Sequence, residues 1–112
     1  MILEQGGIEF RDAIADLMVN GEFGSDDTAE DESDTGLGTP IATSAKAVAI
    51  EKSGLSIQAT HELLSTEANS TSFKEFAIQT SAKDLTRVTT TTLDKDNTEE
   101  VITITTFDIL IN

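Results

Sequence analysis

The 112-residue sequence predicts an all-β fold, a jelly-roll-like antiparallel β-sandwich with one N-terminal helix. Only one segment, near the N-terminus, carries a helical hydrophobic period. From Pro40 onward apolar residues alternate with polar ones, threonine is abundant, and short turn signals separate the alternating segments. Strands with no long helices between them are typical of a sandwich or small barrel. The length suits a single domain over residues 1–112.

The first expected element is a helix at about residues 8–20. Its apolar residues recur at i, i+3, i+4, i+7 and i+8, which is the stripe that one face of a helix turns to a core. Asn20-Gly21 follows and suits the left-handed conformation that ends helices. We therefore expect the stripe to face the core of the domain. It consists of Phe10, Ala13, Ile14, Leu17 and Met18.

An acidic loop is expected next, at about residues 22–39. Residues 22–34 carry seven acids and no base, which is typical of a solvated loop. Clustered carboxylates are also the oxygen ligands that Ca²⁺ takes, although their spacing is not that of an EF-hand. Two interpretations stay open: a loop kept soluble by its charge, or a calcium site. The candidate metal ligands are Asp26, Asp27, Glu30, Asp31 and Asp34.

The remaining elements are strands. Residues 46–52 and 55–63 each carry apolar residues in phase, and Ser53-Gly54 between them predicts a tight β-hairpin. Residues 66–72 break the pattern, and strands are expected again at about 73–80, 85–93 and 99–111.

The last of these strands is apolar on both of its faces. Phe107, Ile109 and Ile111 lie on one phase together with Val101, whereas Ile102, Ile104 and Leu110 lie on the other. Two explanations remain open. The strand is central in the sandwich and has a bulge near Thr105-Thr106, or one face packs on the core while a partner subunit covers the other. The candidate interface residues are Phe107, Ile109 and Ile111.

The charge of the chain limits its functions. Twenty-one acids against seven Lys and Arg give a net charge of −14, which argues against nucleic acid and against anionic membranes as partners. Few lysines and many acids also fit a halophilic host. His61 lies in phase with Leu63 and is predicted to be a structural residue facing the interior. Because no nucleophile-elbow motif accompanies it, we predict no enzymatic activity, and no cofactor apart from the calcium considered above.

Several segments, read in order, resemble a family of small structural proteins of tailed viruses, described in phages and archaeal viruses as tail-fibre or virion-associated proteins. Two departures occur: the family's glycine after Glu-Ala-Asn is Ser70, and its Gly-Leu-Phe is Ala77-Ile78-Gln79. The segments that carry the resemblance are RDAIADLMVNG (11–21), GSDDTAEDESDTGLGTPI (24–41), STEANSTSFKEFAIQTSAKDLTRV (65–88) and VITITTFDI (101–109).

The resemblance implies a homo-oligomeric building block of a virion, in contact with copies of itself and with other virion structural proteins. A tail, baseplate or fibre-attachment component is the first expectation. The alternatives are a capsid surface decoration or turret protein, and a calcium-dependent surface adhesion module. The family brings no catalytic residues to this chain.

Overall fold

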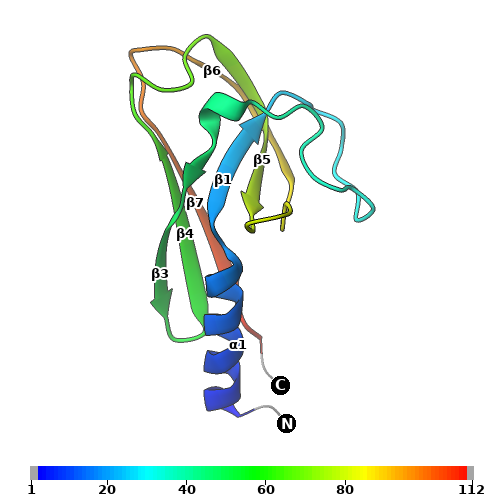
Figure 1. Cartoon of the computed structure of the whole chain (residues 1–112), viewed down its shortest axis with the longest axis vertical. Coiled ribbons are helices and arrows are strands. Elements are labelled where there is room, and N and C mark those ends of the chain that lie inside the picture. The colour runs from blue at the N-terminus through cyan, green and yellow to red at the C-terminus, as the bar shows by residue number, and fades with distance from the viewer. Residues whose placement is uncertain (1–2, 111–112) are drawn as a thin grey trace.

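A computed structural model describes residues 3–110 of the chain, which form one α-helix, a short 3-10 helix and seven strands (Figure 1). The helices and strands are α1 (Glu4–Leu17), β1 (Asn20–Gly24), η1 (Ala42–Ser44), β2 (Lys46–Ala47), β3 (Ala49–Ser53), β4 (Ser56–Leu63), β5 (Thr71–Gln79), β6 (Val88–Lys95) and β7 (Val101–Asp108). A four-stranded sheet has the order β2-β1-β5-β6, and a three-stranded sheet has the order β3-β4-β7. All their strand pairs are antiparallel. The predicted antiparallel β-sandwich with an N-terminal helix is confirmed.

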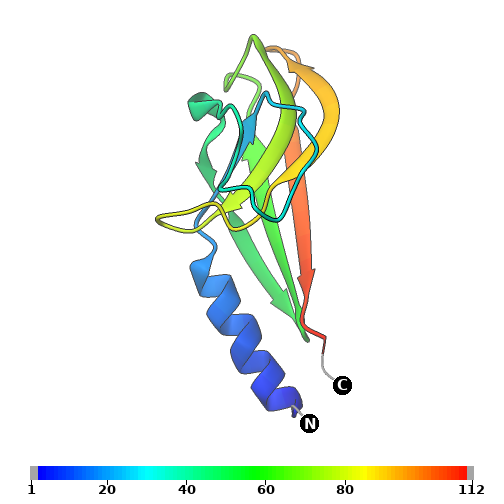
Figure 2. The same cartoon turned by 90° about the vertical axis from the view of Figure 1, so that its right-hand side faces the viewer.

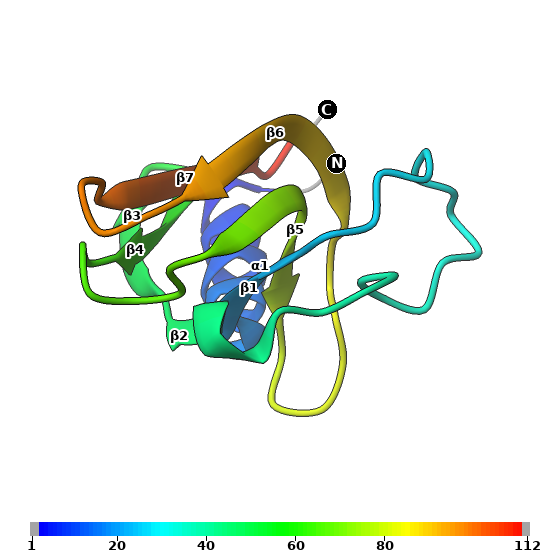
Figure 3. The ribbon, with the colours of Figure 1, turned by 90° about the horizontal axis from the view of Figure 1, so that it is seen from above.

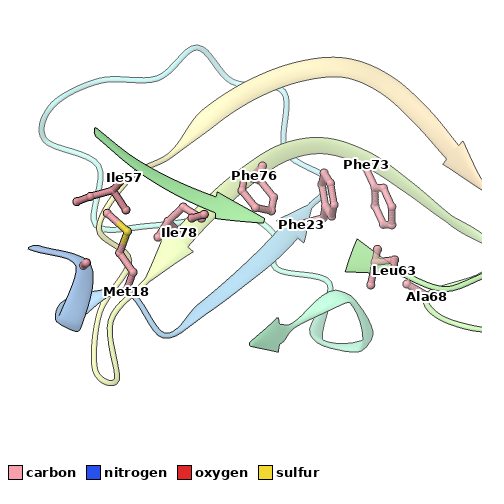
Figure 4. Close-up of a cluster of buried hydrophobic side chains, with 10 residues drawn as sticks. Met18, Phe23, Ile57, Leu63, Ala68, Phe73, Phe76 and Ile78 are labelled. Atoms are coloured by element: carbon pink, nitrogen blue, oxygen red, sulfur yellow. The ribbon is translucent and has the colours of Figure 1, made fainter. Parts of the chain in front are cut away.

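The core lies between the two sheets, which face each other when seen from above in Figure 3. Three phenylalanines form its centre: Phe23 stacks on Phe73 with ring centroids 4.2 Å apart, and Phe76 lies 4.8 Å from Phe23. Figure 4 shows the aliphatic side chains around them. The buried cluster consists of Ala15, Met18, Phe23, Ile57, Ala59, Leu63, Ala68, Phe73, Phe76 and Ile78.

A bulge in β5 lets both of its phenylalanines reach this core. Side chains alternate between the two faces of a strand, so Phe73 and Phe76, three residues apart, would otherwise point to opposite faces. The register with β6 shifts between Phe73 and Glu75, and both rings turn inward. Glu75 therefore points to the outer face of the four-stranded sheet.

The predicted hairpin at Ser53-Gly54 is confirmed. Ser53 pairs with Ser56, and Gly54 has φ 55°, a left-handed conformation that glycine adopts without a steric penalty. Along β4 the residues Ile57, Ala59 and Leu63 are buried and alternate with more exposed positions, as the period of two predicts.

The helix differs from its prediction in position and in the face it buries. It begins at Glu4 rather than near residue 8, and Asn20-Gly21 opens β1 instead of ending the helix. The predicted core stripe is wrong for Phe10, Ala13 and Leu17, which are exposed. Within that stripe only Met18 is fully buried, while Ile14 is half-buried.

The reason is that α1 packs on the sandwich through its smallest residues. Gly7 and Ala15 are its buried positions, and Arg11 Nη1 donates to the carbonyl oxygen of Gly54 at 2.6 Å. Lys52 Nζ of the hairpin lies 3.2 Å from Asp12 Oδ1. These contacts fix α1 beside the β3–β4 hairpin (Figure 2), and Phe10, Ala13 and Leu17 stay exposed.

The last strand also differs from its prediction. The ladder between β7 and β4 runs without a shift from Val101–Leu63 to Asp108–Ser56, so the proposed bulge is wrong. Within residues 3–110, β7 pairs with β4 alone and is an edge strand rather than a central one. Phe107 packs against the core and is half-buried, as is Ile109, whereas Ile102 and Ile104 are exposed. Ile111 lies outside the described residues.

We predict that Ser70→Gly stabilises the fold by about 1 kcal/mol. Ser70 has φ 63°, which an L-residue adopts only with strain. Urea denaturation measures the gain. The control is Ser81→Gly, an exposed turn position without a positive φ, where added flexibility gives no gain. Equal stability changes at both positions would contradict the prediction.

Candidate functional site

A buried carboxylate, that of Glu75, organises the outer face of the four-stranded sheet. It accepts hydrogen bonds from the backbone amides of Asp26 (3.0 Å), Gly38 (2.8 Å) and Thr39 (3.0 Å), and from Arg87 Nε (2.8 Å). These amides lie near the two ends of the acidic loop, which begins at residue 25, after β1, rather than at residue 22, and runs to residue 39. One side chain of β5 thus holds both ends of the loop on the sheet.

Glycine at position 24 makes room for this carboxylate. Gly24 of β1 pairs with Glu75, and a Cβ at position 24 would lie 2.3 Å from Glu75 Oε2. Any larger residue would push the carboxylate away from the backbone amides that donate hydrogen bonds to it.

Arg87 joins the acidic loop to the same carboxylate from the other side. It directly precedes β6, and its side chain is only 6% exposed. Besides Glu75 it binds Asp34 Oδ2 at 3.1 Å through Nη1, and the carbonyl oxygen of Thr28 at 2.8 Å through Nη2. A planar guanidinium with several donors suits such a junction between a carboxylate and a carbonyl.

These contacts decide the ionisation of Glu75. Burial raises the pKa of this carboxyl, but hydrogen bonds from Thr39, Arg87, Gly38 and Asp26 lower it more, and the net pKa lies below its ordinary value. Glu75 is therefore ionised at neutral pH, and Arg87 supplies the compensating positive charge.

The acidic loop and the segment leading into β6 enclose an open hollow of about 470 Å³. Its lining includes Glu30, Asp31, Glu32, Asp34, Asp84 and Arg87. Most of its charged groups are acids, so the hollow has a strongly negative field that favours cations over anions.

The five predicted calcium ligands are not brought together. Within residues 3–110, no group of three or more His, Cys, Asp or Glu side chains is placed to hold a metal ion. Three of them accept hydrogen bonds from other residues instead: Asp26 from Thr28, Asp31 from Ser33, and Glu30 from Thr89. Asp34 binds Arg87, and Asp27 is exposed.

The same hydrogen bonds lower the pKa of three of these acids. The backbone and hydroxyl of Thr28 lower that of Asp26, the hydroxyl of Thr89 lowers that of Glu30, and the hydroxyl and amide of Ser33 lower that of Asp31. A calcium site would require these carboxylates to point toward one ion. Here each of them is instead engaged in a local hydrogen bond.

His61 faces the interior, as predicted. It is fully buried, with its edge against Phe23 and Phe76, and its Nε2 lies 2.8 Å from the carbonyl oxygen of Ser44. Its Nδ1 has no hydrogen-bond partner within the described part of the chain. The four-stranded sheet separates this imidazole from the acidic hollow on the outer face.

Sequence reasoning missed the pair of Glu75 and Arg87. The signal was Glu75, an acid in the strand segment that also holds the apolar residues Phe73, Phe76, Ala77 and Ile78. A buried acid needs a partner, and Arg87, twelve residues along the chain, supplies it.

No family model matches this chain, and no curated protein or solved structure matches it either. Within residues 3–110, no helix has both the length and the apolar character needed to cross a membrane.

We predict that Glu75→Gln destabilises the protein by about 2 kcal/mol, because a buried set of donors loses its charged acceptor. The amides of Asp26, Gly38 and Thr39 should lose protection in hydrogen exchange. The matched control is Glu62→Gln on the exposed face of β4, which should change neither quantity.

The sign of the pH dependence follows from the lowered pKa of Glu75. The stability that this group contributes is fully present above the ordinary glutamate value of 4.5 and is lost as the pH falls through the lowered one. Unchanged protection of the three amides in Glu75→Gln would contradict the role of this side chain.

We predict that His61 titrates below its ordinary pKa of 6.5, because burial penalises the imidazolium more than the Ser44 carbonyl stabilises it. Nearby Lys46 lowers the pKa further, and Glu67 raises it. The unfolded chain then binds the proton more readily, so stability falls as the pH drops below 6.5. An NMR titration of the only histidine measures this directly, and a midpoint at or above 6.5 would refute it.

Proposed function

We propose that this chain is a structural protein of a tailed virus that acts through protein–protein contacts, as a tail, baseplate or fibre-attachment component of the virion. The observation that carries the proposal is an exposed apolar seam on α1. The resemblance to small virion proteins supports its assignment to a virus particle.

The seam repeats every seven residues. Leu3, Phe10 and Leu17 are 68%, 53% and 52% exposed, and the small residues Gly6 and Ala13 lie three positions after the first two. This is the spacing of the a and d positions in a coiled coil, where the helices of neighbouring subunits meet. Small residues at d allow two helix backbones to approach closely.

Helix α1 makes few apolar contacts with its own domain. It is 14 residues long, contains Gly6 and Gly7, and buries only Gly7 and Ala15 among its own residues. The residue at its N-cap, Leu3, offers no side-chain hydrogen bond. Helices of this length are marginal alone, so an apolar surface packed on the seam would stabilise α1.

Charge favours parallel packing of copies around a symmetry axis. Glu9 and Asp16 flank the seam on one side, while Gly7 and Ile14 flank it on the other. Antiparallel helices would place Glu9 opposite Asp16 of the next copy, whereas parallel helices keep these acids apart. In Figure 1 the acidic loop lies far from α1, so its charges stay outside such a contact.

This evidence bears differently on the two alternatives. A capsid decoration or turret protein would use the same seam and differs only in its place in the particle. The calcium-dependent adhesion module is not favoured, because the acidic side chains of the loop do not converge.

We predict that the double variant Phe10→Glu, Leu17→Glu associates at least about tenfold more weakly than the natural chain, since two charges enter an apolar seam. Mass photometry and light scattering at low and molar salt measure this. The control Gln5→Glu adds a charge on the same helix away from the seam and should associate normally. A natural chain that stays monomeric at tens of micromolar would contradict the contact function.

The virion assignment has its own measurement. Mass spectrometry of purified virus particles should find the chain at a fixed ratio to the major structural proteins, and its absence from the particles would exclude this assignment. Labelled antibodies in electron micrographs then place it on the tail or on the capsid.

A further inference from the structure

Strand β7 offers an unpaired edge to a second molecule. It pairs with β4 on one side, and within residues 3–110 no strand pairs with its other side. Edge strands of soluble proteins are commonly protected by lysine, proline or a bulge. The segment from Val101 to Phe107 contains no charged residue and no proline, and its ladder has no bulge.

One hydrogen bond determines which backbone groups of this edge are free. Ile109 N donates to Leu55 O at 2.8 Å and continues the register in which Phe107 pairs with Ile57. Hydrogen-bonded pairs recur at every second residue of an antiparallel ladder. The odd-numbered residues of β7 therefore bond to β4, while Ile102, Ile104 and Thr106 direct their N–H and C=O groups to the open edge.

The same residues carry the exposed apolar side chains of the strand. Ile102 and Ile104 are 58% and 57% exposed on the outer face of the three-stranded sheet. This edge is uncharged in a chain with a net charge of −14, whereas β3 carries Glu51 and Lys52 and β6 carries Asp94. Two copies that repel each other elsewhere can approach here at the lowest electrostatic cost.

We infer that a second copy of this chain pairs with β7 in antiparallel fashion across a two-fold axis, which joins the two three-stranded sheets into one six-stranded sheet. The inference rests on the proposed function in that it specifies one of the contacts through which copies assemble. It uses a surface separate from the α1 seam.

The register of this contact follows from the free backbone groups and the charges. Pairing Ile102 with Ile104 of the second copy satisfies the open N–H and C=O groups of both, and brings the exposed isoleucines together twice. Thr103 then lies on the two-fold axis, opposite its own equivalent, as a pair without mutual hydrogen bonds.

Neighbouring registers are less favourable. A two-fold axis at Ile104 would place Glu100 opposite Asp108 of the second copy, which sets like charges against each other. An axis at Ile102 would place Ile104 opposite Glu100. Centring on Thr103 avoids both, and the edge is self-complementary, as a contact between identical copies requires.

Disulfide trapping tests the register, because the chain has no cysteine of its own. In an antiparallel pair without mutual hydrogen bonds the Cα atoms lie about 4.5 Å apart, which a disulfide spans. Thr103→Cys should form a covalent dimer under mild oxidation. Thr105→Cys is the control, because its equivalent would be displaced by four residues, about 13 Å along the strand.

The experiment uses the Phe10→Glu, Leu17→Glu background, so that the α1 seam does not contribute. Oxidised Thr103→Cys is expected to give a dimer with twice the 12.0 kDa mass of the chain. Ile104→Lys in this background should abolish the non-covalent dimer while keeping the thermal melting transition. Dimers that persist in Ile104→Lys, equal trapping at both cysteines, or trapping at neither would overturn the β7 contact.

The two proposals fail separately. Loss of the β7 dimer leaves association through the α1 seam intact, and this would be seen as unchanged oligomers of Ile104→Lys in the natural α1 sequence. Loss of the α1 contact instead leaves the dimer that Thr103→Cys traps.

Discussion

The Glu75 carboxylate accepts hydrogen bonds from both ends of the acidic loop and from Arg87, and the outer layer of the fold depends on this interaction. A buried charge is costly unless all of its hydrogen-bonding capacity is met. That requirement explains why Gly24 stands opposite it and why Arg87 is almost fully covered. The loop, the glycine and the arginine therefore form one unit, and a change in any of them affects the others.

Short sequence patterns correctly predicted the features that depend on interactions between neighbouring residues. The Ser53-Gly54 hairpin depends on neighbouring residues and was predicted correctly, as were the strand regions from residue 46 onward and the inward direction of His61. Strand β1 was missed, because its residues were expected to end the helix and to begin the acidic loop. The buried face of α1 was not predicted correctly. A periodic apolar stripe that includes Phe10 and Leu17 is equally compatible with packing on a core and with packing on another subunit. Small residues, rather than large apolar ones, make the contact of α1 with its own domain.

Features set by topology could not be predicted in the same way. Alternation shows that β7 is apolar on both faces, but its place at the edge depends on how distant strands are ordered. Composition likewise suggested calcium, whereas Thr28 and Ser33 beside the acids engage them in local turns. The pair of Glu75 and Arg87 spans twelve residues and a bulge, which no short-range pattern contains.

Holding the acidic loop at its two ends also makes its middle interchangeable. Between Asp26 and Gly38 the loop is held by Arg87, by Thr89 through Glu30 and by Asp84 through the amide of Leu37. Its other residues are free to differ as long as the anchoring amides remain. Closing a longer loop costs only about 0.6 kcal/mol for each doubling of its length. The geometry accordingly suits the display of a peptide: a foreign epitope placed between the anchors would be held at both of its ends.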